Sequence, residues 1–335
     1  MTNLQWCIKT ESLPTITLNI GKYTSIYNEY ETIEEDLLNV INQYFKKRNS
    51  NKSHVTIAEM LNQEEISPLS YESIIIDNRA IDNEFLLSSN SIINKKLQRD
   101  FYENIESSSY IESINVLFED LLNLINKTEL PLKIKAFDIK QFIKLLSFEY
   151  SLNEDYSKLI VRIEQILPLL VEELNKQYGG KLLLIYLYPE ANLSPKEQIR
   201  LKELIISLGI DIIVLTGSLH FLAEDWKYNN YIRCDNQKIS SELVDNLLWN
   251  APLNFERSEI EQSLNQFILA YQDKIEIKPI ISNYQIAQIM LFSSIDLYVG
   301  VSYMQHCNHE FILNIDETKL PLSMAKYLEQ FVKEN

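Results

Sequence analysis

The sequence predicts an α/β fold, because it contains a strand, a helix and a second strand in the order of a parallel-sheet crossover. Residues 182–188 form a continuous apolar run, which is typical of a strand that is buried on both faces of a sheet. Ser194 and Glu197 then form a capping box that starts a helix, and Gly209 marks the end of that helix. Residues 211–216 supply the next buried strand.

The loop between this first strand and its helix, residues 188–194, contains no glycine. A loop that cradles phosphate needs glycines between strand and helix, so the crossover resembles a nucleotide-binding one without its nucleotide site. The Gly-Lys pairs at residues 21–22 and 180–181 lack the spacing of a phosphate loop, and each lysine leads into a predicted strand. The sequence therefore predicts no nucleotide cofactor.

The first quarter of the chain predicts short strands around one helix. Thr32 and Glu35 form a capping box for this helix, which ends on cations at residues 46–48. The predicted strands are 4–9, 15–20, 23–28, 55–58 and 73–76, and the helix is 32–47.

Residues 85–178 have helical periodicity nearly throughout, with predicted breaks at 107–109, 126–131 and 147–151. Strands precede this block and strands follow it. We therefore expect a helical domain that is inserted into one α/β domain.

Composition restricts the partners. The chain has 335 residues, 46% of them hydrophobic, and a formal net charge of −16. Such a surface repels phosphate on average, so any contact with nucleic acid must be local. Three dispersed cysteines and the absence of a long apolar run predict a cytoplasmic protein without membrane contact.

The local excess of positive charge is greatest between residues 127 and 144. This segment carries five lysines and only two acids, Glu129 and Asp138. The lysines are either phosphate contacts or a solvated surface, and no arginine stands in a base-reading motif. The candidate DNA-binding residues are Lys133, Lys135, Lys140 and Lys144, then Lys95, Lys96 and Arg99, then Lys46, Lys47, Arg48 and Lys52.

A second chemical cluster comprises His306, Cys307, His309 and Glu310. These side chains are zinc ligands if they converge. Residues 297–315 have a β-like pattern, however, which places His306 and Cys307 on opposite faces of a strand. A structural role is the favoured interpretation.

The order of several elements resembles one known family. A long helix over 156–178, the strand at 181–185, the helix start at 193–197 and the strand at 212–215 are similar to the spacer-acquisition accessory proteins of type II-A CRISPR systems. The order of three earlier elements is also similar to that family: the N-terminal hairpin, the strand at 23–28 and the motif Glu129-Leu-x-Leu132. The similarity covers about residues 1–250, and 251–335 resembles the C-terminal extension of the long subtype.

The resemblance implies a degenerate P-loop-ATPase-like head domain (1–78 and 177–250), an inserted helical leg domain (79–176) and a C-terminal α+β extension (251–335). It implies a homotetrameric ring that binds double-stranded DNA ends through a basic channel without sequence preference, and no enzymatic activity. It also implies calcium, and partnership with the adaptation integrase complex and the effector nuclease.

The turn that holds carboxylates in short members of this family departs from the pattern here. Pro131, Lys133 and Lys135 occupy much of the turn, and only Glu129 and Asp138 remain as metal candidates. Because calcium requires several oxygen ligands, the sequence does not support a calcium site of that type.

Two other functions stay open. A nucleotide-dependent switch of P-loop ancestry needs the loop glycines and a strand-end acidic pair, whereas strand 211–216 ends in Thr216-Gly217. A metal-dependent nuclease needs clustered carboxylates, and Glu224-Asp225 is the one candidate pair near the predicted sheet.

Overall fold

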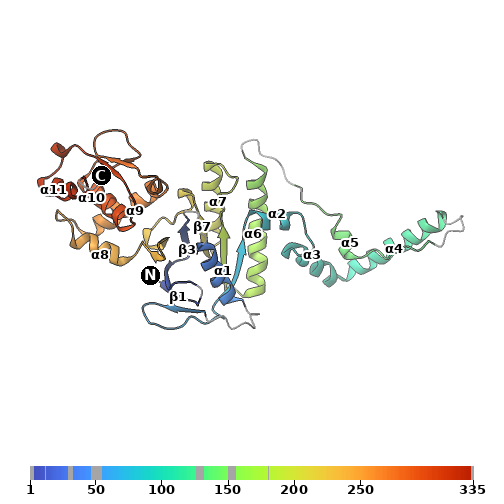
Figure 1. Cartoon of the computed structure of the whole chain (residues 1–335). Helices are drawn as coiled ribbons and strands as arrows, with labels where there is room; N and C mark the ends of the chain where they lie inside the picture. Colours follow the sequence, from blue (N-terminus) through green and yellow to red (C-terminus); the bar gives the residue numbers. More distant parts are fainter. Residues whose placement is uncertain are drawn as a thin grey trace. The chain divides into compact units, whose positions relative to one another are not determined.

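The computed structural model describes residues 4–11, 13–28, 33–46, 55–125, 132–149, 156–179 and 181–332 (Figure 1). It divides into two compact units: Met1–Ile75 with Lys181–Asn335, and Ile76–Gly180. The second unit interrupts the sequence of the first, so it is an insertion. The predicted α/β class is confirmed.

The main sheet of the first unit has six strands in the order β5-β6-β7-β3-β8-β9. Neighbours β6 and β7, β7 and β3, and β3 and β8 pair in parallel, and β9 pairs antiparallel to β8. The predicted crossover is confirmed as β6, α7 and β7. The strands are β3 (Tyr23–Tyr27), β5 (Glu72–Ile76), β6 (Leu182–Leu187), β7 (Asp211–Thr216), β8 (Asn229–Arg233) and β9 (Asn236–Gln237), with helices α1 (Ile33–Phe45) and α7 (Pro195–Ser207).

Local signals explain the ends of α7. The backbone N–H of Ser194 donates to Glu197 Oε2 over 2.9 Å, as a capping box requires. Gly209 follows the helix with φ of +67°, a conformation that glycine adopts without the steric cost of a side chain. The cap of α1 that we predicted at Thr32 lies outside the described residues.

A smaller antiparallel sheet covers the same core. Its strands are β1 (Leu4–Lys9), β2 (Ile16–Ile20) and β4 (Thr56–Glu59), in the order β2-β1-β4. Trp6 of β1 is fully buried, and its ring lies 5.7 Å from that of Phe45 and 5.8 Å from that of Tyr71. These aromatic contacts fix β1 against α1.

Residues 251–335 belong to the same compact unit as the main sheet. Their buried side chains form one cluster that includes Tyr231 of β8. Whether they form a separate extension domain stays a prediction. Beyond two short 3₁₀ turns, the described elements from residue 241 onward are α8 (Ser241–Trp249), α9 (Arg257–Tyr271), β10 (Ile280–Ser282), β11 (Ile289–Met290), α10 (Ser294–His306), β12 (Ile312–Asn314) and α11 (Leu322–Val332).

The strand that we predicted over 297–315 is wrong for most of its length, because α10 occupies residues up to His306. Residues 297–304 of this helix are buried apart from the half-buried Ser302, so these two turns show no amphipathic period that would distinguish a helix from a strand. A side chain on Gly300 would approach Phe267 and Leu291 within 3 Å. Close helix packing therefore explains the glycine.

The second unit contains five helices within its described residues: α2 (Asn78–Phe85), α3 (Ile92–Glu103), α4 (Ile105–Ile125), α5 (Ile139–Ile143) and α6 (Lys158–Tyr178). The break that we predicted at 107–109 is wrong. Asn104 Oδ1 accepts from the N–H of Glu106 over 2.9 Å, and the serines fall in the first turns of α4. Among the described residues, no helix has both the length and the apolarity needed to cross a membrane.

Candidate nucleic-acid interface

The first group of candidate lysines lies on a segment that returns along α4. Residues 132–138 have no regular secondary structure and precede α5. Asn115 of α4 holds this segment by two bonds: its Nδ2 donates to the carbonyl of Phe137 over 3.0 Å, and its Oδ1 accepts from the N–H of Phe137 over 2.6 Å. The ring of Phe118 packs edge-on against that of Phe137 at 5.7 Å. These contacts fix the backbone at Phe137, which lies between Lys135 and Lys140.

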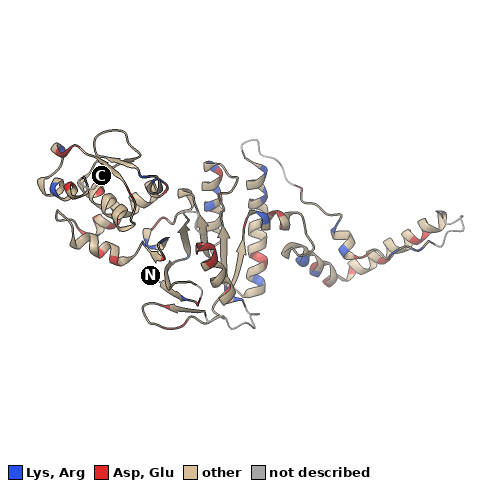
Figure 2. Ribbon diagram, viewed as in Figure 1, with Lys and Arg blue, Asp and Glu red and all other residues tan. Residues whose placement is uncertain are grey.

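All four lysines of this group are exposed. Lys133 and Lys135 lie on the irregular part, Lys140 is on α5, and Lys144 caps α5 at its C-terminal end. None of them forms an ion pair with any described residue. We name residues 132–144 the return segment; Asp138 is its single acid, so its formal charge is +3. The structure thus brings the four lysines into one short, solvent-facing stretch (Figure 2).

The metal candidates do not form a site in the described chain. Asp138 accepts from the N–H of Gln141 over 2.8 Å and forms a capping box with it, so its carboxylate starts α5. Glu129 lies outside the described residues. No group of three His, Cys, Asp or Glu side chains suited to a metal occurs in the described ranges. These residues do not fit calcium, which requires six or more oxygen ligands.

The second group of candidates, on α3, is already engaged within the helical unit. Arg99 Nη2 contacts Glu173 Oε1 of α6 at 2.6 Å, and Lys96 pairs with Asp100 one turn away. Burial by itself raises the pKa of Glu173, but the hydrogen bonds from Arg99 and Gln177 outweigh it, and the pKa is lowered. Lys95 is exposed and has no such partner. Arg99 and Lys96 thus have partners within the helical unit, whereas Lys95 has no ion-pair partner among the described residues.

The third group lies mostly outside the described residues, which include Lys46 but not Lys47, Arg48 or Lys52. Lys46 is exposed and directly follows the end of α1. With Asn42 in its hydrogen-bonded orientation, the amide oxygen accepts from Lys46 Nζ over 3.2 Å. The position of Lys46 agrees with the simpler interpretation of a helix end.

At the carboxyl ends of β6 and β7, the side-chain carboxylate of Glu190 occupies the place where an anionic ligand could bind. Ligands of open α/β sheets bind at this edge. Here Glu190 accepts from the Thr216 hydroxyl over 2.8 Å and from the Gly217 N–H over 2.7 Å. A backbone N–H and a hydroxyl at a strand end are donors that a phosphate also uses, and the carboxylate already occupies them. This arrangement disfavours a phosphate at the same place.

Tyrosine and carboxylate groups fill the adjoining end of β3. Tyr188, whose φ is +47°, donates its hydroxyl to Glu35 Oε1 over 2.6 Å. The amide of Asn28 donates to the same hydroxyl oxygen over 2.6 Å. Burial raises the pKa of Tyr188, and its bond to Glu35 and the charge of Glu35 raise it further, so the phenol stays neutral. The negative charges at this edge would repel a nucleotide.

Packing accounts for the glycine of the first Gly-Lys pair, whereas Gly180 of the second pair lies outside the described residues. A side chain on Gly21 would come within 2.5 Å of the ring of Tyr228, so close approach of that ring explains the glycine. Gly179 caps the end of α6 with φ of +64°.

The nuclease candidate Asp225 accepts from the N–H of Lys227 over 3.0 Å and starts a short 3₁₀ turn, Trp226–Tyr228. His306 is exposed and Cys307 is fully buried, so these two side chains do not share a site.

Sequence reasoning did not identify Glu190. A carboxylate that satisfies donors on another loop leaves no local motif, because Thr216 follows it 26 residues later. The one available signal is its place directly after a buried strand, where functional groups of parallel sheets gather.

We expect ATP at millimolar concentration to leave the melting temperature unchanged. Glu190 occupies the strand-end donors, and a ligand present at 100 times its dissociation constant would stabilise the fold by about 2.7 kcal/mol. Differential scanning fluorimetry with and without ATP and Mg²⁺ tests this expectation. A rise of several degrees would support the switch-protein alternative.

No protein-family model and no curated protein matches the chain. Among solved structures, the chain is similar to Stu0660 of Streptococcus thermophilus, with a TM-score of 0.60 and 14% sequence identity, over 98% of this chain and 99% of that one. A nucleotide-free ATP-binding cassette of an ABC transporter has a TM-score of 0.35 and 13% identity over 75% of this chain and 96% of that one, too low to support an argument. The chain therefore shares the mixed α/β fold of Stu0660 along nearly its whole length.

Proposed function

We propose that this protein is an accessory protein of CRISPR spacer acquisition, which binds the ends of double-stranded DNA as a homotetrameric ring. The observation that carries the proposal is the return segment. It presents four exposed lysines, none of which forms an ion pair with a described residue, on a chain whose formal charge is −16. The formal charge of +3 over these 13 residues contrasts with the acidity of the whole chain and supports a local contact with phosphate.

The chemistry of the return segment suits the DNA backbone. Lysine ammonium groups on an irregular stretch act as point charges towards phosphates and do not read base edges. The binding is therefore independent of sequence, and it weakens steeply with salt as counterions are released. Repetition of the segment in several copies of the chain adds many weak contacts around one duplex.

The helical unit also supports self-association. Leu117, Leu121 and Leu124 of α4 are 65%, 54% and 72% exposed, and they are spaced along one side of the helix. In a single chain this apolar strip is exposed to water, and packing against a second copy of the chain would bury it. In the proposed ring, α4 forms contacts between copies while the lysines face the DNA.

Two likenesses support the assignment to spacer acquisition. The order of strands and helices resembles the accessory family of type II-A systems, and the fold is that of Stu0660 over nearly the whole chain. The proposal includes a head of P-loop ancestry without a nucleotide, and it assigns the chain no catalytic step. The adaptation integrase complex and the effector nuclease are proposed as partners from the resemblance alone.

Light scattering coupled to size-exclusion chromatography tests both parts of the proposal. We expect a mass four times that of one chain, and co-elution with a blunt duplex at low salt that is lost as the salt rises. Addition and chelation of calcium form a parallel pair of runs. A monomer at all concentrations, or a duplex that never co-elutes, would contradict the proposal.

A further inference from the structure

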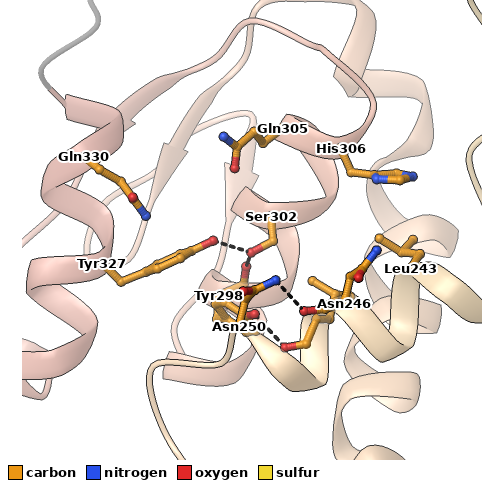
Figure 3. Close-up of a pocket in the computed structure, with 10 residues that line it drawn as sticks. Leu243, Asn246, Asn250, Tyr298, Ser302, Gln305, His306, Tyr327 and Gln330 are labelled. Atoms are coloured by element: carbon orange, nitrogen blue, oxygen red, sulfur yellow. Dashed lines mark hydrogen bonds between the residues drawn. The ribbon is translucent and has the colours of Figure 1, made fainter.

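A hollow of about 510 Å³ lies among α8, α10 and α11, and most of its lining comes from residues after 250, to which the resemblance assigns no role. Figure 3 shows Tyr327 and His306 on opposite sides of it, with Gln305 between them. Ligand pockets usually measure about 300 to 1,000 Å³. The hollow is therefore large enough for a small organic ligand.

No side chain that lines this hollow carries a formal charge. His306 is its one titratable group near neutral pH, and partial desolvation of this exposed imidazole, together with the charge of Lys238, lowers the pKa of His306. This shift favours the neutral imidazole. In a strongly acidic chain this environment favours an uncharged ligand, because a charged one would find no counter-charge in the lining.

The polar groups of the hollow are mostly unused. The side-chain amides of Asn246, Gln305 and Gln330 hydrogen-bond to no other described residue, so each offers a donor and an acceptor. Asn250 Nδ2 donates to the carbonyl of Asn246 over 2.9 Å, which leaves its own carbonyl oxygen as a further acceptor. Paired donors and acceptors of this kind match the edge of a planar amide-like group.

The aromatic side of the hollow is held rigidly. The ring of Tyr327 packs at 5.1 Å against Tyr298 and at 5.3 Å against Phe331. Its hydroxyl lies 2.7 Å from the Ser302 hydroxyl, and Tyr298 donates to the carbonyl of Leu247 over 2.6 Å. A ring fixed in this way loses little entropy when a flat ligand packs on it.

We propose that this hollow binds an unpaired nucleobase. A base is flat, uncharged, and bears neighbouring donors and acceptors on its edge, and proteins hold unpaired bases by stacking on aromatic rings and by edge hydrogen bonds. The base would contact Tyr327 and His306 and bond to Asn246 and Gln305. The inference that this base comes from a frayed or overhanging DNA end rests on the proposed function. The binding of a free nucleoside does not depend on that function.

Titration of the full chain with the four deoxynucleosides tests the site itself. We expect saturable binding, seen by calorimetry and as shifts of side-chain amide signals in NMR spectra. Combined Asn246→Ala and Gln305→Ala should weaken it at least about tenfold, which corresponds to about 1.4 kcal/mol. Gln285→Ala removes an exposed amide outside the hollow and should leave it unchanged. Absence of nucleoside binding, or equal binding of a neutral sugar such as glucose, would overturn the proposal.

A second comparison separates this site from duplex binding. A duplex with a short single-stranded overhang should bind several-fold more tightly than a blunt duplex, and the double variant should lose that preference while it retains the blunt-duplex affinity. A wild-type protein that binds nucleosides but no duplex would contradict the proposed function alone. Equal preference for the overhang in wild type and double variant would overturn the assignment of the base to this hollow.

Discussion

Replacing Lys133, Lys135, Lys140 and Lys144 with glutamate should lower the affinity for double-stranded DNA at least about a hundredfold at low salt. The change removes four phosphate contacts in each chain and adds four repelling charges. The fold should tolerate it, because all four side chains are exposed and such substitutions usually alter stability by about 0.5 kcal/mol or less per site. Fluorescence anisotropy with a labelled duplex measures the affinity, and light scattering measures the oligomer.

A matched variant separates position from net charge. Lys9, Lys22, Lys181 and Lys326 are exposed and lie in the other unit, so their replacement by glutamate changes the total charge equally. This control should lose much less affinity than the variant of the return segment. Equal loss in both variants would show that only total charge matters. Unchanged binding by the return-segment variant would shift attention to Lys95 and to the group at 46–52.

Removing the Glu190 carboxylate should destabilise the main sheet by about 2 to 3 kcal/mol. Glu190→Ala leaves the Thr216 hydroxyl and the Gly217 N–H without their charged acceptor, and hydrogen bonds to charged groups contribute about 1.5 to 3 kcal/mol each. Because Glu190 is only half-buried, water replaces part of what is lost, so the expected loss is smaller than the full contribution of both bonds. Glu190→Gln keeps one acceptor oxygen and should cost roughly half as much. Urea unfolding of the three proteins gives the free energies of unfolding.

Small anions should distinguish an anion site from a simple packing defect. Formate or phosphate should restore part of the lost stability to Glu190→Ala, since either anion can accept from the two vacated donors, and should have little effect on the wild type. Sodium chloride at equal ionic strength is the control. Equal stabilisation of wild type and variant would show that Glu190 does not occupy an anion site.

The crossover at the centre of the fold could be predicted because its signals are local. A continuous apolar run marks β6, Ser194 and Glu197 mark the start of α7, and Gly209 marks its end. Each signal lies within a few residues of the element that it defines, so one sequence is sufficient to place it.

The errors arose where distant residues decide the structure. Helix α10 was mistaken for a strand because its central two turns, residues 297–304, are buried almost all round, which removes the amphipathic pattern. The ion pair of Arg99 with Glu173 was not predicted, because the two residues lie 74 positions apart in the sequence and no local pattern connects them. The lysines of the return segment were visible as an excess of local charge, but their exposure and lack of partners required the structure.

The central claim is that DNA enters a closed ring through a free end, and the topology of the DNA tests it most directly. A linear duplex and a relaxed covalently closed circle of the same sequence offer the same phosphates, and only the first has an end to thread. In a competition against a labelled linear duplex, we expect unlabelled linear DNA to compete and the closed circle to fail. A closed circle that competes as well as the linear duplex would contradict the account.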